Sequence, residues 1–239
     1  MSFVITMYVR EGIVLASDSR LTLNTATQQG NSQVVQMAVG QSDSNYKTFL
    51  ADRIGISTFG AADVGGEPLG GHIESFMQEH LIGKGVEVDD VPKKLLEYFA
   101  RFQPAPATQF HVAGYIKVNG SSVQRIWDVN VASGTINLLN AQGLPGASWG
   151  GEGDILQRLL LPMASLNQSG VQESILPQHH IPWQFFTMQD AIDFCIFAVR
   201  STIDAIRFQP RPKTVGGPID VLVIKPNEAL WVQRKELHA

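Results

Sequence analysis

The chain opens with two short apolar runs separated by a polar break. Residues 4–9 and 13–16 are rich in β-branched side chains, and Gly12 lies in the break between them. This pattern predicts a β-hairpin with the glycine in its turn. Because both runs are apolar almost throughout, we expect strands that are buried on both faces. The second strand leads into a polar cluster, and the hairpin returns Asp18 to the neighbourhood of Ser2.

Further along the chain, stretches with strand character alternate with stretches whose apolar residues recur at helical spacing. Turn residues such as Asn119-Gly120 separate the strands. The expected elements, in chain order, are strands at 46–50 and 53–60, helices at 72–81 and 91–102, strands between 109 and 139, helices at 155–161 and 188–207, and a closing strand pair between 214 and 232.

Two long polar segments interrupt this order. Residues 22–45 are rich in Thr, Gln, Asn, Ser and Gly around one apolar island, so we expect a loop or a loosely held hairpin. Near a candidate site, such a segment is a lid, an assembly contact or a solvated excursion. Residues 165–187 also predict a loop, with Trp183, Phe185 and Phe186 attaching it to the body or to a partner.

Composition narrows the class of protein. Among the 239 residues, 44% are hydrophobic and 17% are charged, which is typical of a globular core with some covered surface. The net charge of −4 argues against nucleic-acid binding. A single cysteine, Cys195, excludes a disulfide within the chain. Apolar runs too short for a bilayer and the absence of a signal-peptide pattern predict a cytoplasmic protein with no membrane partner.

The candidate chemistry begins at the second residue. A small residue after Met1 favours removal of the methionine, so Ser2 is expected to become the chain terminus. A terminal serine carries a hydroxyl and an α-amine, whose reference pKa is about 8. That amine can accept the hydroxyl proton and generate a nucleophile without a histidine.

Several segments together carry a family resemblance. They are Ala16-Ser17-Asp18-Ser19-Arg20, Tyr46-Lys47-Thr48 and Phe59-Gly60-Ala61-Ala62-Asp63. In this order they resemble the proteasome β-type branch of the N-terminal-nucleophile (Ntn) hydrolases, nearest its bacterial members and the ancestral β-subunit group. The resemblance implies an α+β fold, a four-layer αββα sandwich, as a single domain over 1–239 with a loop insertion at 22–45. It also implies hydrolysis of peptide bonds without a metal or organic cofactor.

The resemblance assigns a role to each matching residue. Ser2 is the nucleophile and its own α-amine the general base. Lys47 favours the alkoxide electrostatically, and Asp18 and Arg20 hold and orient it. The backbone N–H of Gly60 stabilises the oxyanion. By the same resemblance, two further residues, Thr58 and Ala62, line a small and weakly selective pocket for substrate.

Two departures lie on the amine side of the expected site. Gly151-Glu152-Gly153 stands where proteasome subunits have Gly-Ser-Gly, so Glu152 replaces a serine that helps to polarise the amine. A carboxylate there favours the protonated amine and weakens it as a base. The competing interpretation is that Glu152 or Asp154 simply caps the following helix. Pro212 and Val215 occupy positions where catalytic subunits have a supporting Asp and Ser.

These departures leave two other functions open. One is a catalytically inactive proteasome-like assembly subunit, and the other is an Ntn amidase acting on a small amide. The expected partners are a peptide substrate and further copies of the chain in a ring or other homo-oligomer, with any ATPase partner undefined. His111 and Cys195 are interpreted as structural residues, and the adjacent His179-His180 pair as no metal site.

Overall fold

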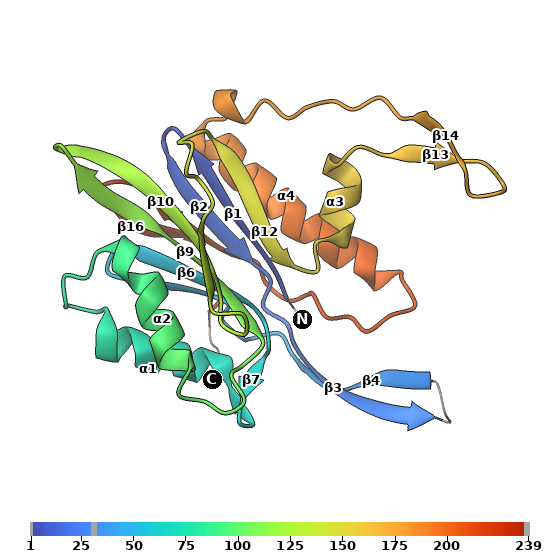
Figure 1. Ribbon diagram of the computed structural model, residues 1–239, viewed down its shortest axis with the longest axis horizontal. Helices are drawn as coiled ribbons and strands as arrows, with labels where there is room; N and C mark the ends of the chain where they lie inside the picture. The colour runs from blue at the N-terminus through green and yellow to red at the C-terminus, as the bar shows by residue number, and fades with distance from the viewer. Residues whose placement is uncertain (1, 30–32, 237–239) are drawn as a thin grey trace.

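The computed structural model describes residues 2–29 and 33–236. The described residues form a mixed α/β chain with two five-stranded sheets and three small two-stranded ones. Figure 1 shows helices α1 and α2 on the side of one large sheet and helices α3 and α4 on the side of the other. The predicted removal of Met1 concerns a residue outside the described range, and so does a part of the predicted insertion, residues 30–32.

The first large sheet has the order β12-β1-β2-β15-β16. Its strands are β12 (Gly146–Gly151), β1 (Phe3–Val9), β2 (Gly12–Ser17), β15 (Asp220–Ile224) and β16 (Ala229–Gln233). The β1–β2 hairpin, paired from Val4↔Ser17 to Val9↔Gly12, is buried along its whole length, which confirms the prediction from its apolar runs.

Two helices cover this sheet. Helix α3 (Asp154–Leu160) and the long helix α4 (Met188–Arg207) share a buried core with β1, β2 and β15. Helix α4 begins with a capping box in which Thr187 and Asp190 satisfy each other's backbone N–H groups. Its bounds match the predicted helix. The buried thiol of Cys195 lies in this core, and burial raises its pKa, as for an inert core residue.

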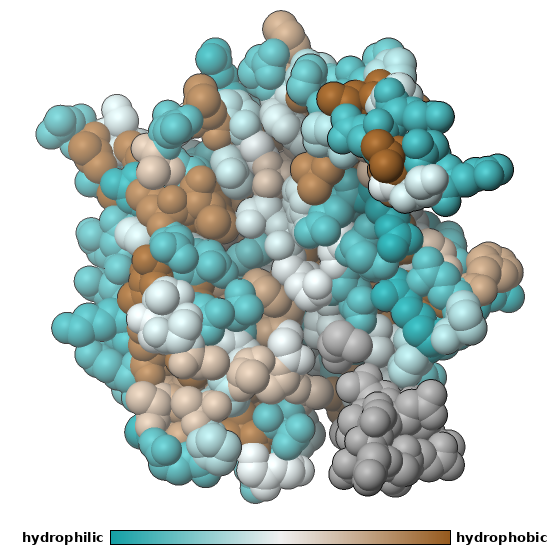
Figure 2. All heavy atoms as spheres, turned by 45° about the vertical axis from the view of Figure 1, so that its right-hand side comes forward, coloured by the Kyte–Doolittle hydropathy of each residue, from teal (hydrophilic) through white to brown (hydrophobic). Residues whose placement is uncertain are grey.

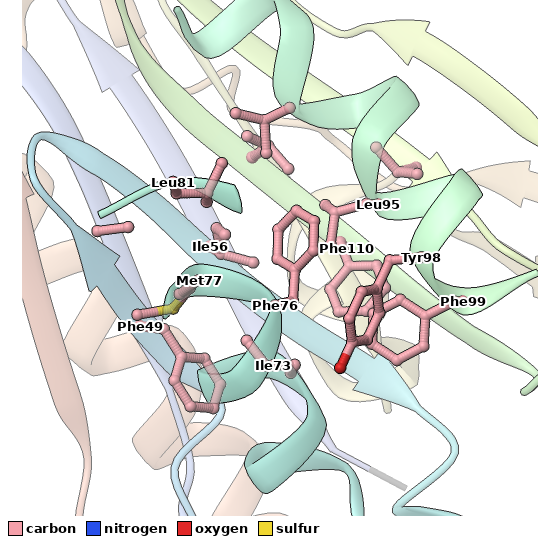
Figure 3. Close-up of a cluster of buried hydrophobic side chains, with 14 of the residues drawn as sticks. Phe49, Ile56, Ile73, Phe76, Met77, Leu81, Leu95, Tyr98, Phe99 and Phe110 are labelled. Atoms are coloured by element: carbon pink, nitrogen blue, oxygen red, sulfur yellow. The ribbon is translucent and has the colours of Figure 1, made fainter. Parts of the chain in front are cut away.

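The second large sheet has the order β11-β10-β9-β6-β5. Its strands are β11 (Thr135–Leu138), β10 (Ser121–Asn130), β9 (Thr108–Val118), β6 (Ile54–Gly60) and β5 (Thr48–Ala51). Helices α1 (Leu69–His80) and α2 (Val91–Phe99) pack against it, with the short 3₁₀ turn η1 (Val88–Asp90) leading into α2. Figure 3 shows Phe76 and Phe99 of these helices facing Phe49 and Phe110 of the sheet.

The two sheets meet through a third buried cluster. Ile13, Leu15 and Leu222 of the first sheet pack with Ala113 and Ile126 of the second. Polar contacts also cross between the sheets, and in one of them Thr6 Oγ1 lies 3.0 Å from Nδ1 of buried His111. This places His111 in the structural role expected from the sequence.

The two polar segments contain more regular structure than expected. Strands β3 (Leu21–Gln29) and β4 (Gln33–Ser42) pair as an antiparallel hairpin that projects from the body, so for these residues the hairpin alternative is confirmed and the loop alternative is wrong. The later segment, predicted to be a loop, contains strands β13 (Ala164–Leu166) and β14 (Gln172–Ile175) and the 3₁₀ turn η2 (Trp183–Phe185).

The aromatic anchors of that later segment divide into two kinds. Trp183 and Phe186 pack edge-on against Phe194 of α4 with ring centroids 5.1 and 6.2 Å away. Phe185 is 77% exposed, so it does not attach the segment to the body, and for this residue the alternative of attachment to a partner stays a prediction. The 3₁₀ turn directs neighbouring side chains to different sides, which is why only part of the trio reaches the helix.

The last short elements are β7 (Asp63–Val64) and β8 (Glu67–Pro68), a small turn that leads into α1. None of the helices in the described part of the chain has the length and apolar character needed to cross a membrane.

Candidate active site

The β1–β2 hairpin brings the start of the chain beside Asp18. Ser2 directly precedes β1 and Asp18 directly follows β2, so the antiparallel register leaves the two residues adjacent. The backbone N–H of Phe3 donates to Asp18 Oδ1 at 3.0 Å, and the N–H of Asp18 donates to the Phe3 carbonyl at 3.3 Å. The proximity of Ser2 and Asp18 therefore follows from strand pairing.

The Asp18 carboxylate is fully buried and accepts four hydrogen bonds from the described residues. Its Oδ1 accepts from Phe3 N and from Lys47 Nζ, the latter at 2.7 Å. Its Oδ2 accepts from the backbone N–H groups of Arg20 and Gly216 at 3.1 and 3.0 Å. Three of these donors are backbone groups, so the carboxylate has one fixed position from which it holds Lys47.

Lys47 lies immediately before β5, and its side chain is only 6% exposed. Its carbonyl accepts a hydrogen bond from the N–H of Thr58 at 2.8 Å, which fixes its backbone on β6. Burial lowers the pKa of the Lys47 ammonium, while the Asp18 carboxylate acts in the opposite direction. The Lys47 ammonium is thus a desolvated cation that is paired with the Asp18 carboxylate.

The structure places the Arg20 guanidinium differently from expectation. It forms a bidentate pair with Asp43, at 2.6 Å from Nε and 2.7 Å from Nη2, and reaches the Lys213 carbonyl at 3.5 Å. The hydrogen bonds to Asp43 raise the pKa of Arg20 and lower the pKa of Asp43. Arg20 therefore meets Asp18 through its backbone N–H, while its side chain ties the base of the β3–β4 hairpin to the segment around Lys213.

A small pocket contains the expected nucleophile and the buried lysine together. Ser2 and Lys47 both line it, along with Thr58 and Ala62. Other lining residues are Arg20, Leu21, Asn45, Tyr46, Ala61, Leu69 and Gly70. Its volume is about 30 Å³, enough for roughly one or two water molecules. Most of the residues selected from the sequence are thus brought to one place.

Gly60 ends β6 beside this pocket, but its neighbour Ala61 forms the lining. Its φ is +104°, and a Cβ at this position would overlap the Ala107 carbonyl. Only glycine tolerates this combination of positive φ and close backbone approach. The sharp bend turns the chain from the strand toward the pocket wall.

A backbone clamp holds Ser2 from the other side. The Ser2 carbonyl accepts a hydrogen bond from the N–H of Glu152 at 2.8 Å. At Gly151, φ is +84° and a Cβ would overlap the Ser2 carbonyl oxygen. Glycine is therefore required where β12 meets the chain start. The Gly-Glu-Gly motif thus has a steric role independent of any charge on Glu152.

The Glu152 side chain points into a network that the sequence did not indicate. Its carboxylate accepts from Arg211 Nη1 at 3.2 Å and from Thr214 Oγ1 at 2.9 Å. Arg211 also pairs with Asp154 at 3.2 Å. The N-cap of α3 is Gly153, and no side chain makes a capping hydrogen bond there, so neither Glu152 nor Asp154 is a hydrogen-bonding cap. Asp154 does lie in the first turn of α3, where a negative charge suits the helix dipole.

Sequence reasoning also missed a second buried ion pair, between Asp220 and Lys235. Asp220 starts β15 and Lys235 follows β16, so their meeting depends on the pairing of these two strands. No short-range spacing signals such a contact. The only sequence hint is a charged residue at the start of an otherwise apolar strand.

A larger hollow lies elsewhere on the described surface. A groove of about 650 Å³ is lined by residues that include Arg10, Tyr115, Gln124 and Leu144. It is formed where Gln124 donates to the carbonyls of Val9 and Gly12 at the turn of the first hairpin. Its lining lacks a buried lysine held by a carboxylate, which the small pocket at Ser2 has, so the pocket at Ser2 is the better candidate for chemistry.

Comparison with known proteins gives a structural likeness alone. No family model matches the sequence, and no curated protein matches it. Among solved structures, the chain is similar to Anbu, a Gly-1 mutant from Hyphomicrobium sp. strain MC1. The similarity has a TM-score of 0.59 and 12% sequence identity, and it covers all of this chain and 88% of that one. The chain therefore shares the broad proteasome-like fold that its sequence resemblance predicted.

Proposed function

We propose that the chain is a proteasome-type peptidase that hydrolyses peptide bonds with Ser2 as an N-terminal nucleophile, exposed when Met1 is removed. One observation carries the proposal: Ser2 shares a pocket with a buried lysine that Asp18 holds at 2.7 Å. The peptide unit between Ser2 and Phe3 is held by Asp18 at its N–H and by the Glu152 N–H at its carbonyl. In this proposal the two sheets and their outer helices are one domain, the four-layer αββα sandwich of the bacterial proteasome-like branch.

The proposed reaction has two halves, acylation of Ser2 and hydrolysis of the acyl-enzyme. Each half transfers one acyl group and uses the α-amine to accept and return one proton. The Ser2 Oγ proton passes to the α-amine while Oγ attacks the substrate carbonyl carbon. The Lys47 ammonium stabilises the negative charge on Oγ, and the Gly60 N–H donates to the developing oxyanion. Collapse of the tetrahedral intermediate expels the leaving amine, which takes the proton from the α-ammonium. Water then attacks the acyl-enzyme by the same route and restores Ser2.

The small pocket sets the substrate preference in this proposal. Thr58 and Ala62 line it, and the Thr58 hydroxyl is engaged by Thr108 Oγ1 at 3.1 Å, so it does not swing freely. With a volume of about 30 Å³, the pocket accepts a small side chain better than an aromatic one. The same dimension suits a small acyl group, which is why the amidase alternative is kept as the second candidate.

Glu152 modulates the amine in this proposal, with its charge balanced by Arg211. A lone carboxylate would favour the protonated amine, whereas a carboxylate that already accepts from Arg211 and Thr214 has a weaker effect. In this proposal, Glu152 paired with Arg211 therefore allows the α-amine of Ser2 to lose its proton near neutral pH.

The direct test uses chains whose first residue is set by cleavage of a removable N-terminal fusion. The chain that starts at Ser2 is expected to hydrolyse short peptide amides, and Ser2→Ala is expected to remove this activity without changing thermal unfolding. A matched control keeps the fusion, which blocks the α-amine while leaving the hydroxyl. Equal activity in the Ser2→Ala chain would refute the assignment. A parallel panel of small acyl amides separates the peptidase from the amidase.

We also propose that the chain self-associates. Apolar side chains stay exposed along the segment between α3 and α4, and Figure 2 shows hydrophobic residues exposed among hydrophilic ones on that face. They include Leu161, Met163, Leu166, Ile175 and Leu176, each at least 43% exposed. Such a run is expected to be covered in an assembly. Sedimentation velocity of the purified chain tests this, and a single monomeric species at micromolar concentration would contradict it.

If intact-mass analysis finds Met1 retained on cell-derived protein that still assembles, the inactive assembly subunit replaces the peptidase as the better account.

A further inference from the structure

A second buried ion pair lies beside the site and is made by the end of the described chain. The Lys235 ammonium pairs with the Asp220 carboxylate, and the Lys235 backbone N–H donates to Asp220 Oδ1 at 2.8 Å. The two side chains are 3% and 0% exposed. Both the charge and the backbone of Lys235 are therefore fixed to β15, although it follows the edge strand β16.

Strand pairing sets this ion pair next to the first one. Asp220 is paired with Ser17 across β15 and β2, and Ser17 is the residue before Asp18. The Ser17 hydroxyl accepts from Thr48 Oγ1 at 2.9 Å, and Thr48 is the residue after Lys47. The Asp220–Lys235 pair is thus linked to the Asp18–Lys47 pair through Ser17 and Thr48, which are the chain neighbours of Asp18 and Lys47. The Lys235 charge contributes to lowering the pKa of Lys47.

Two cations from the same segment, Arg234 and Lys235, pack on the ring of Tyr46, which lines the pocket. Lys235 Nζ lies 4.1 Å from the centroid of the Tyr46 ring. The Arg234 guanidinium carbon lies 4.9 Å from that ring and 4.8 Å from the Trp231 ring. Cations at these distances from an aromatic face are attracted to it. Tyr46 lines the pocket with Ser2 and directly precedes Lys47.

We propose that Lys235, anchored by Asp220, is a positioning residue that holds Tyr46 as the wall of the Ser2 pocket and so shapes the binding of the acyl group. This inference rests on the proposed function, because it concerns the substrate side of the same site. It assigns the C-terminal segment a role in substrate binding that the sequence resemblance did not include.

The placement of this pair argues against a purely stabilising role. A buried ion pair is often replaceable by apolar residues without loss of stability, so its presence needs another reason. A more exposed pair of similar type, Lys225 with Glu228, joins the other end of the β15–β16 hairpin at 3.0 Å. That pair is the matched control, since it lies in the turn that joins the same two strands and does not line the pocket.

The test measures acylation of the Ser2 hydroxyl by a small β-lactone in the chain that starts at Ser2. Rates over a range of lactone concentrations give a maximum rate and a half-saturation concentration. Lys235→Met and Tyr46→Leu are expected to raise the half-saturation concentration about tenfold, with a smaller change in the maximum rate. Lys235→Arg, Tyr46→Phe and the control Lys225→Met are expected to stay within about twofold of wild type.

A second variant separates an effect on lactone binding from an effect on folding. The double change Asp220→Asn with Lys235→Met removes both charges, so no unpaired buried carboxylate remains. It is expected to unfold like wild type and still to show the raised half-saturation concentration. Wild-type binding of the lactone in this folded double variant would overturn the proposal, as would equal defects in Tyr46→Phe and Tyr46→Leu.

A readout independent of acylation separates this inference from the proposed function. Carbon-13 labelling of the tyrosine rings gives few signals, because the chain has four tyrosines, and Tyr46→Phe assigns the relevant one. That signal is expected to move in Lys235→Met and not in Lys225→Met. If wild type is not acylated while the signal moves, the proposed function fails and the packing of Tyr46 stands. If the signal stays in place, the positioning role fails by itself.

Discussion

Two acidic residues contact the start of the chain, and their carboxylates are held in opposite ways. Asp18 accepts three of its four hydrogen bonds from backbone N–H groups, and Lys47 is its one side-chain donor among the described residues. Glu152 contributes its backbone N–H to Ser2, but its carboxylate is held by side chains, those of Arg211 and Thr214. The contacts of Asp18 are part of the strand pairing. The contacts of the Glu152 carboxylate come from side chains in the loop that follows α4.

The contrast shows which part of the site the fold itself determines. Any chain that closes the β1–β2 hairpin in this register presents backbone donors to residue 18, so the lysine side follows from the fold. The amine side depends on which side chains follow α4. Here Arg211 balances the charge of Glu152 and Thr214 donates a hydrogen bond to it. We therefore expect changes at Asp18 to damage fold and chemistry together, and changes at Arg211 to affect chemistry more than fold.

The largest effect is expected for Asp18→Asn. It leaves the Lys47 ammonium buried without its partner, which costs about 3–5 kcal/mol of unfolding free energy. Urea unfolding measures this loss. Adding Lys47→Met to Asp18→Asn removes the stranded charge and is expected to restore much of the stability but no acylation of Ser2. A cost below about 1 kcal/mol for Asp18→Asn would show that the pair is not desolvated.

The loss of folding stability in acid limits the pH range in which the Asp18 side and the Glu152 side of the site can be compared. Burial lowers the pKa of His111 from 6.5 to about 4. Its neutral form is favoured in the fold, so the stability it contributes is present above pH 6.5 and lost as pH falls toward 4. The full loss corresponds to about 3 kcal/mol. Urea unfolding of wild type and His111→Gln between pH 7 and 4 measures it, and an equal slope in both would contradict this origin.

Arg211→Met tests the amine side. Removing the guanidinium leaves the Glu152 carboxylate uncompensated, which favours the protonated α-amine and raises its pKa. A rise of about one unit lowers acylation about tenfold at neutral pH and recovers at higher pH. The pH profile of acylation checks this, with Arg158→Met as control because Arg158 pairs with Asp154 at an exposed site. A uniform loss at all pH values would point to misfolding instead.

The smallest effect is expected for Asp43→Asn. Its pair with Arg20 is bidentate but the Asp43 side chain is 45% exposed, so the cost in unfolding free energy is below about 1 kcal/mol. High salt is expected to reduce the difference further. The same urea measurement as for Asp18→Asn serves here, and a cost comparable to that of Asp18→Asn would remove the distinction between the buried and the exposed pair.

The sequence allowed much of the scaffold to be predicted. The apolar runs predicted the β1–β2 hairpin, and the apolar spacing after Thr187 predicted α4. Ser2, Asp18, Lys47, Thr58 and Ala62 were selected by resemblance, and the structure brings them to one pocket or its edge.

Other features depend on three-dimensional packing that no local pattern records. The Arg20 guanidinium turns to Asp43, because the β3–β4 hairpin brings that carboxylate back to its own base. Lys235 meets Asp220 through a strand pair with a register shift, so their separation in sequence gives no signal. Exposed Phe185 belongs to an aromatic cluster by composition and lies outside it in the structure.

The most direct test of the account is to map where a β-lactone acylates the chain that starts at Ser2. Digestion and mass spectrometry of the labelled protein are expected to find one modified site, the Ser2 hydroxyl, with labelling lost in Lys47→Met and in the chain whose amine is blocked. Labelling at another residue, or equal labelling of Ser2 with its amine blocked, would contradict the claim that Ser2 and its own amine act together beside Lys47.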